Sequence, residues 1–438
     1  MSSNRGNKKH ICVVVLGDFG RSPRMQYHSL SLAKHNYLVD VVAYKGSSPF
    51  NQVLENERIQ IHYMKEVPAI IGRTPKIIQY ILKTIWQALL LFWTLLCLSK
   101  MNCILLQNPP SIPTLPVCWL ISWLRYCSLF VDFHNYGYTI LSLSTGKKSK
   151  LVKFAKWCEM YFGRKANKSI CVTKAMKDDL NENWNIRASV LYDCPPSIFH
   201  PISVEEKHYF FKKMSETYPQ FKSKLETAEN ETRFTKLIED KCELLPSRPA
   251  LVVSSTSWTE DEDFSLLLAA LDDYEEAATR RKDLPNLIVA ITGKGHLKSY
   301  YEKEIKNKNF LRVEVITLWL KFEDYPTFLA CADLGISLHS SSSGLDLPMK
   351  VVDMFGCCLP VCAVSFNCID ELVKNGENGL VFTSAIQLSN QLQCLFNDFP
   401  RKKTDLNIFH KNLMKSSNLK WDENWNHTVY PLLNELSL

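Results

Sequence analysis

Two separate parts of the chain alternate short apolar runs with helix-like segments, and this alternation constrains the fold more than any other feature. In the first part, residues 11–16 and 38–43 are β-rich apolar runs separated by a helix-like stretch. In the second part, residues 250–254, 287–292 and 334–339 repeat the pattern. Alternation of this kind is typical of parallel sheets covered by helices on both faces. We therefore predict an α/β protein with two Rossmann-like, doubly wound parallel-sheet domains and a C-terminal helical tail.

Length and composition suggest where these domains begin and end. A chain of 438 residues is long enough for two or three domains. Several prolines near residue 200 indicate a joint, and the residues after them are charged and helix-prone with little strand character. We predict an N-terminal domain over 1–200, a charged helical insertion or linker over 201–248, a C-terminal domain over 249–404 and terminal helices over 405–438.

Charge and cysteine content narrow the functional class. The formal net charge of +7 is modest for this length, so it permits attraction to lipid headgroups or phosphorylated substrates but does not indicate nucleic-acid binding. The 15 cysteines are scattered and no pair has zinc-ligand spacing, which favours reduced thiols in the cytosol and predicts no metal site. Residues 1–10 lack the apolar core of a signal peptide.

Residues 76–98 form the most apolar helix expected in the chain. The stretch is just long enough to span a bilayer, but polar residues interrupt it. Its aromatic residues Tyr80, Trp86 and Trp93 suit a membrane interface. We interpret the segment as a helix that lies in or dips into one leaflet, joined by a second apolar helix over 113–126. A buried core helix is the alternative.

Residues 333–360 combine a strand, a polar loop and a helix start in an order that suits a diphosphate. Asp346 is placed to cap the helix, whose unpaired N–H groups and dipole would favour an anion. Lys350 in the first turn would hold phosphate oxygens, and Asp353 would accept hydrogen bonds from ribose hydroxyls. The alternative is an ordinary strand–loop–helix in which Lys350 and Asp353 form a solvated pair.

Polar loops also follow other strands in both halves. The loop over 17–24 has neither the glycine spacing of a dinucleotide fingerprint nor the Gly-Lys-Ser/Thr of a P-loop. In the second half, residues 255–258 and 293–296 follow two of the strands. Ligands of doubly wound sheets bind at the carboxyl ends of the strands, so we expect the ligand site in a cleft between the two domains.

Six segments together match one known family. They span nearly the whole chain and are Val13–His28, Gln107–Pro113, Asp132–Tyr138, Ser254–Asp263, Ile291–Gly295 and Ser341–Val361. With them the chain resembles the GT-B glycosyltransferases, and among these the β-mannosyltransferases that act on dolichol-linked chitobiose. The short GKG motif alone would indicate only GT-B.

The resemblance implies an enzyme and its substrates. Mannose would move from GDP-mannose to di-N-acetylchitobiosyl diphosphodolichol with inversion, forming the first β-1,4-mannose of the lipid-linked oligosaccharide for N-glycosylation. The catalytic domains would lie on the cytosolic face of the endoplasmic reticulum membrane, and other early mannosyltransferases of the pathway are possible partners. No bound metal would be required, although a stimulatory divalent cation remains compatible.

The chain departs from the family pattern in two places. Many GT-B enzymes carry two glutamates eight positions apart beside the nucleotide sugar, where this chain has Leu345 and Asp353. That pair belongs mostly to retaining enzymes, so its loss is compatible with inversion. The family often has an N-terminal membrane helix, and its absence here would leave membrane attachment to residues 76–98 and their neighbours.

Inversion requires a base that removes the proton of the attacking acceptor hydroxyl. The candidates are Asp18, His134 and Asp132 in the N-terminal domain, with a preference for Asp18 because it follows the first strand. Asp132 is expected to lie too near His134 in sequence to be an ideal partner for it. Glu159 is more consistent with a structural role.

The remaining site residues divide between the two substrates. For the donor we expect Ser255, Thr256, Gly293, Lys294, Gly295, Ser343, Gly344, Asp346, Lys350 and Asp353. For the acceptor we expect Gly17, Gly20, Arg21, Arg24 and Asn135, with the two arginines binding its diphosphate. The competing hypotheses are a retaining GT-B enzyme that uses another nucleotide sugar, and a catalytically silent GT-B-like scaffold subunit.

Overall fold

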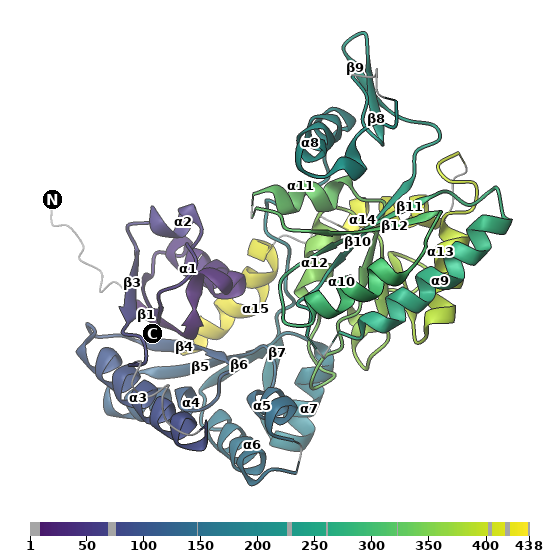
Figure 1. Ribbon diagram of the computed structural model, residues 1–438. Coiled ribbons are helices and arrows are strands. Elements are labelled where there is room, and N and C mark those ends of the chain that lie inside the picture. Colours follow the sequence, from purple (N-terminus) through teal and green to yellow (C-terminus); the bar gives the residue numbers. More distant parts are fainter. Residues whose placement is uncertain are drawn as a thin grey trace, which may run out of the picture. The chain divides into compact units, whose positions relative to one another are not determined.

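The structure, a computed structural model, describes residues 9–68, 76–146, 148–225, 230–259, 262–321, 323–401, 405–416 and 421–436. The chain divides into two compact units, each with its own parallel sheet (Figure 1). Unit 1 comprises Met1–Asp193 and Lys420–Leu438, and unit 2 comprises Cys194–Leu419. Two Rossmann-like parallel sheets confirm the predicted fold class.

Unit 1 contains a seven-stranded parallel sheet in the order β3-β2-β1-β4-β5-β6-β7. The strands are β1 His10–Asp18, β2 Leu38–Tyr44, β3 Ile59–Met64, β4 Cys103–Asn108, β5 Ser128–Phe133, β6 Lys168–Cys171 and β7 Ala188–Val190. The helices are α1 Pro23–Lys34, α2 Asn51–Leu54, α3 Lys76–Cys97, α4 Thr114–Leu124, α5 Gly137–Thr145, α6 Lys150–Gly163, α7 Lys174–Trp184 and α15 Trp421–Glu435. The apolar residues of β1 are almost completely buried, as expected for a central strand covered on both faces.

Unit 2 contains a six-stranded parallel sheet in the order β12-β11-β10-β13-β14-β15. Its strands are β10 Ala250–Ser255, β11 Leu287–Thr292, β12 Val313–Leu318, β13 Leu334–Ser337, β14 Val361–Val364 and β15 Gly379–Phe382. Its helices are α8 Val204–Thr217, α9 Phe264–Arg280, α10 Lys298–Asn307, α11 Asp324–Cys331, α12 Met349–Gly356, α13 Ala385–Leu395 and α14 Asp405–Ser416. The strand order reverses next to β1 in the first sheet and next to β10 in the second. Doubly wound parallel sheets bind ligands at such reversals, at the carboxyl ends of the strands.

The segment expected to be a helical insertion also contains an antiparallel hairpin. α8 begins with a capping box in which Ser203 and Glu206 satisfy each other's backbone N–H groups. The hairpin pairs β8 Thr235–Ile238 with β9 Lys241–Leu244. Its turn places Glu239 and Asp240 at positive φ, at 44° and 66°. The sequence lacks the Asn-Gly signal that usually marks such a turn, so the hairpin was not expected.

The two terminal helices pack in different units. α14 lies in unit 2, whereas α15 lies in unit 1. The indole of Trp421 donates to Ser31 Oγ at 2.9 Å, and that of Trp425 donates to His28 Nδ1 at 2.9 Å. Both contacts attach α15 to α1, so the C-terminal helix completes the N-terminal sheet unit.

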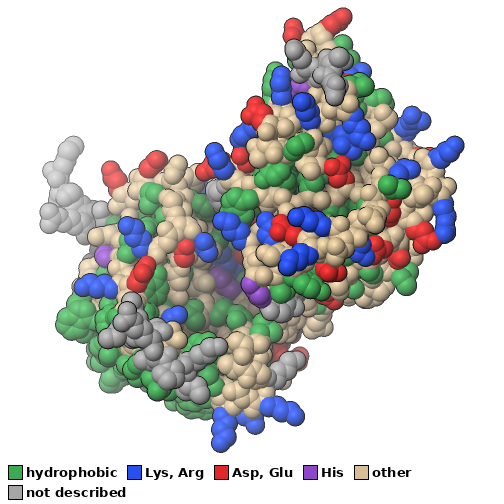
Figure 2. Space-filling view, in the orientation of Figure 1, with side chains coloured by type: hydrophobic (Ala, Val, Ile, Leu, Met, Phe, Trp, Pro, Cys, Tyr) green, Lys and Arg blue, Asp and Glu red, His purple; other side chains and the backbone are tan. Residues whose placement is uncertain are grey.

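Helix α3 presents an exposed apolar face. Its residues Ile78–Cys97 are long and apolar enough to cross a membrane by length and composition, the only such helix within the described ranges. Leu89 and Trp93 are 65% and 64% exposed, and Trp123 of the neighbouring α4 is 66% exposed. Figure 2 shows hydrophobic side chains gathered over this part of unit 1. A core helix would bury these side chains, so the alternative of a buried helix does not fit.

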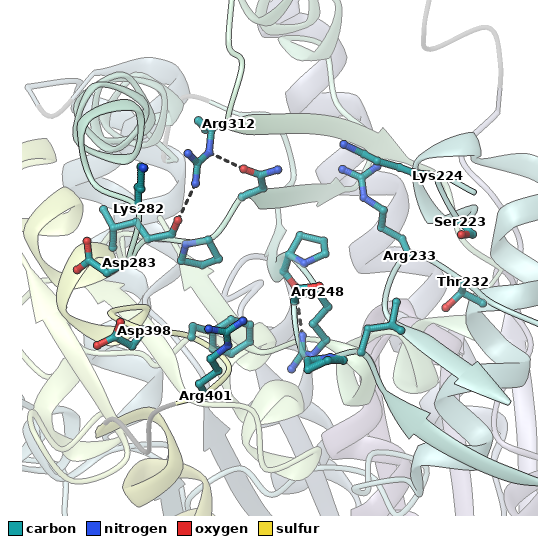
Figure 3. A pocket seen from close by; sticks show the side chains of 18 of the residues that line it. Ser223, Lys224, Thr232, Arg233, Arg248, Lys282, Asp283, Arg312, Asp398 and Arg401 are labelled. Atoms are coloured by element: carbon teal, nitrogen blue, oxygen red, sulfur yellow. Dashed lines mark hydrogen bonds between the residues drawn. The ribbon is translucent and has the colours of Figure 1, made fainter. Parts of the chain in front are cut away.

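Unit 2 has a cavity at the amino-terminal ends of β10, β11 and β12 (Figure 3). Its volume is about 420 Å³. The residues just before β10, β11 and β12 line it, together with the base of the β8–β9 hairpin. The cavity therefore lies at the opposite end of the strands from the predicted donor-binding residues.

Candidate functional site

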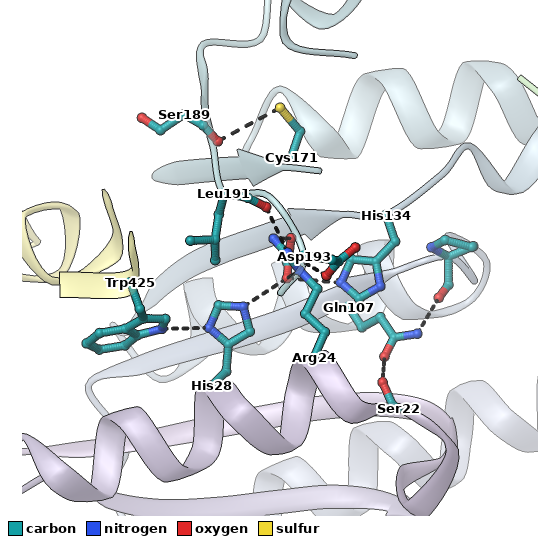
Figure 4. Close-up of polar contacts among 12 residues, drawn as sticks. Ser22, Arg24, His28, Gln107, His134, Cys171, Ser189, Leu191, Asp193 and Trp425 are labelled. Atoms are coloured by element: carbon teal, nitrogen blue, oxygen red, sulfur yellow. Dashed lines mark hydrogen bonds and ion pairs between the residues drawn. The ribbon is translucent and has the colours of Figure 1, made fainter. Parts of the chain in front are cut away.

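The carboxylate of Asp132, at the end of β5, is the centre of a buried polar network. Figure 4 shows the side chains of Arg24, His28 and His134 pointing toward one another. Arg24 donates to it from Nε at 2.8 Å and from Nη2 at 3.0 Å. His28 Nε2 and His134 Nε2 lie 3.0 and 2.9 Å from its Oδ2. Burial, the largest single effect, opposes ionisation, but the charge of Arg24 and the contacts with His134 and His28 together outweigh it and hold the pKa of Asp132 well below its usual range. Asp132 is therefore ionised although it has no solvent exposure.

Arg24 serves this network and does not reach a surface ligand. Its side chain is 5% exposed. Beyond Asp132, its Nη1 donates to Leu191 O at 2.8 Å and to Asp193 Oδ1 at 2.9 Å. A phosphate clamp needs a guanidinium that solvent can reach, so the predicted binding of a diphosphate by Arg24 does not fit. Arg21 is 81% exposed and stays a candidate for that role.

His28, which sequence analysis did not select, is held as a neutral imidazole. Because Trp425 Nε1 donates to its Nδ1, its proton lies on Nε2 and points to Asp132. Burial, the largest effect, lowers the pKa of His28 and outweighs the opposing effect of Asp132. His28 therefore adds a hydrogen bond to the network without adding a charge.

His134 is the one histidine bound to Asp132 that solvent reaches, with its side chain 21% exposed. The expectation that Asp132 is too near in sequence to partner it was wrong. Positions two apart along an extended chain point to the same side, so the end of β5 places both side chains together. Since the carboxylate accepts a proton from Nε2, Nδ1 is left as the proton-accepting atom.

Asp18, the favoured base from sequence, is engaged in a turn. Its Oδ1 accepts the N–H of Gly20 at 3.0 Å and its Oδ2 accepts that of Ser47 at 2.8 Å. Partial burial opposes ionisation, but these N–H groups lower the pKa of Asp18, which weakens it as a base. A Cβ at Gly20 would lie 2.2 Å from Ser47 O, so the turn requires glycine there, while Gly17 borders open space.

Asn135 lies in a loop that Glu159 holds in place. Asn108 Nδ2 donates to Glu159 Oε1 at 2.6 Å and to Asn135 O at 3.2 Å. Glu159 also accepts the N–H groups of Gly137 at 3.0 Å and Tyr138 at 3.2 Å, at the start of α5. Burial raises the pKa of Glu159 to about 7 even though these donors act in the opposite direction. This arrangement agrees with the structural role expected for Glu159.

In unit 2, Lys350 joins the start of α12 to the loop after β10. Its Nζ donates to Glu262 Oε1 at 2.6 Å and to Ser257 Oγ at 3.1 Å. Glu262 is nearly buried, and its Oε2 accepts the hydroxyl of Thr256 and the N–H of Ser257. Lys350 remains 30% exposed, so it has a partner and still reaches solvent. Sequence analysis missed Glu262 because nothing in the acidic run around it distinguishes the buried carboxylate.

Ser255 and Asp353 both lie close to Tyr325 of α11. Ser255 Oγ and Tyr325 Oη are 2.8 Å apart. Burial and then the negative charge of Asp353 raise the pKa of Tyr325. Trp258 is only 2% exposed and packs on Phe264 with ring centroids 4.8 Å apart, so it belongs to the core.

The glycines after β11 allow two loops to touch. A Cβ at Gly293 would lie 1.8 Å from Thr256 O, and one at Gly295 would lie 1.9 Å from Ser257 O. Glycine is therefore required for packing between the two loops. Lys294 between them points over the exposed ring of Trp319, with Nζ 3.7 Å from the ring centroid. Sequence analysis did not select Trp319.

The loop before α12 is organised differently from the prediction. The helix begins at Met349 with Pro348 as its N-cap and no side-chain cap. Asp346 instead accepts the hydroxyls of Ser341 and Ser343 within its own loop, so the predicted cap was wrong. Gly344 has a positive φ of 74°, which this turn requires. Among the described residues, no side chain therefore caps the first N–H groups of α12.

Within the residues that the structure describes, no group of three or more His, Cys, Asp or Glu side chains is arranged to bind a metal ion. Two lysines, Lys294 and Lys350, also lie at the strand ends of unit 2, and Lys350 is paired there with Glu262. The arrangement can attract an anion through two cations and a helix N-terminus.

Comparison with known proteins agrees with this architecture. The model of glycosyl transferases group 1 matches residues 236–405. Chitobiosyldiphosphodolichol beta-mannosyltransferase of Mus musculus is 48% identical and covers 98% of this chain and 90% of its own length. The chain belongs to the chitobiosyldiphosphodolichol beta-mannosyltransferase family. It is a glycosyltransferase of GT-B fold.

A plant relative and a solved structure are also similar to this chain. The UDP-glycosyltransferase TURAN of Arabidopsis thaliana is 46% identical, with 98% of each chain covered. The crystal structure of Anabaena HepE in complex with UDP has a TM-score of 0.64 at 15% identity, covering 98% of this chain and 100% of that one. The similarity to HepE concerns the fold alone.

Proposed function

We propose that this chain transfers mannose from GDP-mannose to di-N-acetylchitobiosyl diphosphodolichol, with inversion at the sugar. The observation that carries the proposal is similarity over nearly the full length to relatives that bear the corresponding name. The polar groups at the strand ends of each unit supply the chemistry that such a transfer needs.

In this proposal His134 is the general base. Asp132 holds the proton on Nε2, so Nδ1 takes the proton of the sugar hydroxyl as its oxygen attacks the mannose carbon. The C–O bond to the diphosphate breaks as the new C–O bond forms, and the electron pair leaves with GDP. The ionised Asp132 then stabilises the imidazolium. Arg21, being exposed, would bind the diphosphate of the acceptor.

The donor would be bound by unit 2. Lys350 and Lys294 would bind the diphosphate together with the N–H groups at the start of α12. These groups neutralise the leaving diphosphate as its charge grows, a role that many other transferases give to a metal ion. Asp353 would accept the ribose hydroxyls. Ser255, Thr256 and the loops with Gly293, Gly295, Ser343 and Gly344 would form the rest of this site.

The acceptor is a lipid, and the exposed apolar face of α3 and α4 suits contact with a membrane. Leu89, Trp93 and Trp123 would insert at the level of the headgroups, with the endoplasmic reticulum membrane as the surface and the catalytic units on its cytosolic face. A helix whose outer face contacts only water would not expose so many large apolar side chains together.

A transfer assay with the purified chain tests the proposal. The chain is incubated with a lipid diphosphate chitobiose acceptor and either GDP-mannose or a UDP-sugar, and the anomeric configuration of the product is read by NMR. We expect a β-linked mannose product from GDP-mannose alone. The name of the Arabidopsis relative makes a UDP-sugar the second candidate donor. Product from a UDP-sugar, or an α-linked product, would contradict the proposal.

A further inference from the structure

The cavity at the amino-terminal ends of β10, β11 and β12 is strongly basic. Its lining includes six cationic side chains and three acidic ones. The cationic residues are Lys224, Arg233, Arg248, Lys282, Arg312 and Arg401. Figure 3 shows those from the hairpin base, the strand starts and the 398–401 loop arranged around one central space. The excess of positive charge points to an anionic ligand.

The acidic side chains of the lining do not neutralise these cations. Asp283 pairs with Arg281, which lies outside the lining, through a contact of 2.5 Å. Glu231 accepts the hydroxyl of Ser223 at 2.9 Å. Among the described residues, the guanidinium of Arg312 donates only to neutral acceptors, Asn286 Oδ1 at 2.5 Å and Leu284 O at 2.7 Å. Within the ranges that the structure describes, no carboxylate pairs with the side chains of Lys224, Lys282, Arg312 or Arg401.

Arg248 is held rigidly in the wall of the cavity. Its side chain is 9% exposed, and its two terminal nitrogens each lie 2.7 Å from the carboxylate of Asp333. Its Nε is buried and has no hydrogen-bond partner among the described residues. The guanidinium also stacks on the ring of Phe399, with Cζ 4.7 Å from the ring centroid, so Arg248 forms a fixed part of the cavity wall.

We propose that this cavity is a second anion site that binds a small, multiply charged phosphate compound. Guanidinium groups match phosphate oxygens in pairs, and lysines add charge without fixed geometry. The volume of about 420 Å³ lies within the range of small-molecule sites. Leu284, Pro285 and Phe399 supply apolar walls for the organic part of such a compound.

This site is separate from the proposed donor site. Pro249, Asn286 and Arg312 immediately precede β10, β11 and β12, whereas Ser255 and Gly293 stand at or just after the far ends of β10 and β11. Six residues of strand separate the two ends, or roughly 20 Å. A ligand in the cavity therefore leaves the donor-binding residues unoccupied.

The test is calorimetric titration of the full chain with inorganic pyrophosphate. Lys224→Ala, Lys282→Ala and Arg401→Ala are combined, because these exposed side chains take part in none of the ion pairs described for the fold. The matched control combines Lys303→Ala, Lys306→Ala and Lys374→Ala, which removes the same charge from exposed positions elsewhere in unit 2. All proteins carry Lys350→Ala, so that the donor site is weakened equally.

We expect the cavity variant to bind pyrophosphate about 100-fold more weakly than the control, with a smaller salt dependence. A second arm uses phosphatidylcholine vesicles with and without phosphatidylinositol 4-phosphate. Loss of vesicle binding in the cavity variant would assign the phosphate to a lipid headgroup, and loss of pyrophosphate binding alone would assign it to a soluble compound.

Equal affinity of both variants for both probes, or no binding by the parent protein, would overturn the proposal. Circular dichroism and urea unfolding show whether the combined variant is folded. If it is not, Arg401→Gln alone replaces it, with an expected loss of about tenfold, and an unchanged affinity there would also overturn the proposal.

Discussion

Both units carry charged side chains at the carboxyl ends of their strands, but the cluster in unit 1 is closed and that in unit 2 is open. In unit 1, Asp132 is fully buried and Arg24 nearly so, and of the two histidines bound to Asp132 only His134 reaches solvent. In unit 2, Lys350 pairs with a buried Glu262 yet stays 30% exposed. The difference suggests that unit 1 fixes one proton-accepting atom rigidly, while unit 2 keeps cations available for exchange with a ligand.

The largest effect is expected from His134→Ala. Loss of a general base lowers turnover by about 10²- to 10⁴-fold. Turnover at saturating GDP-mannose measures this, with Asp18→Asn as the control variant because Asp18 serves a turn. We expect Asp18→Asn to keep turnover within about fivefold of the parent enzyme, well short of the loss of a general base. A large loss in Asp18→Asn with normal turnover in His134→Ala would reverse the assignment.

The closed and open clusters should also differ in their effect on stability. Asp132→Asn removes the carboxylate that accepts two hydrogen bonds from the buried Arg24 and leaves Asp193 as its one remaining ionic partner among the described residues, so the free energy of unfolding should fall by about 3–5 kcal/mol. Glu262→Gln leaves a lysine that solvent can reach, and the loss should be about 1–2 kcal/mol. Urea unfolding of the two variants measures both values. Equal losses would remove the distinction between the clusters.

The pH dependence of stability tests the neutral state of His28. Its pKa is lower in the folded than in the unfolded chain, so its contribution is present above the unfolded pKa of about 6.5 and is lost as the pH falls below that value. His28→Gln keeps a donor for Asp132 and an acceptor for Trp425 but cannot titrate. Between pH 7.5 and 5.5, the variant should lose less free energy of unfolding than the parent, by up to about 1.4 kcal/mol per pH unit. Parallel losses would show that His28 is not held neutral.

The smallest effect is expected at Trp319. Its ring lies under Lys294, and an exposed cation–π contact is worth about 0.5–1 kcal/mol. Trp319→Leu should therefore raise the KM for GDP-mannose by about two- to fivefold with unchanged turnover. Tyr300→Leu, at a similarly exposed aromatic residue, serves as the control. A loss of turnover in Trp319→Leu would show that the ring does more than position the lysine.

The sequence predicted the parallel sheets well because their signals are local. Continuous apolar runs mark β1 and β10, and the loops after them carry the expected small and charged residues. The partners of these residues were not predictable, because they come from distant segments. Arg24 meets Asp132 across 108 positions, and Lys350 meets Glu262 across 88. A pattern read along the chain shows that a charge is present but not whether it is already paired.

The predictions for two loops were wrong or incomplete for a related reason. Asp346 has the residue type and position of a helix cap, but the serines of its own loop compete for its carboxylate. Similarly, the hairpin of β8 and β9 depends on a Glu-Asp turn that few sequences use. In both loops the conformation depends on neighbouring groups, and the positions of those groups are known only once the fold is known.

The measurement that tests the central comparison most directly is steady-state kinetics of His134→Ala and Lys350→Ala in parallel, with Lys303→Ala as the control. We expect His134→Ala to lower kcat and leave the KM for GDP-mannose nearly unchanged. We expect Lys350→Ala to raise that KM by about 10- to 100-fold, with a smaller effect on kcat. An unchanged KM in Lys350→Ala together with a normal kcat in His134→Ala would contradict the account.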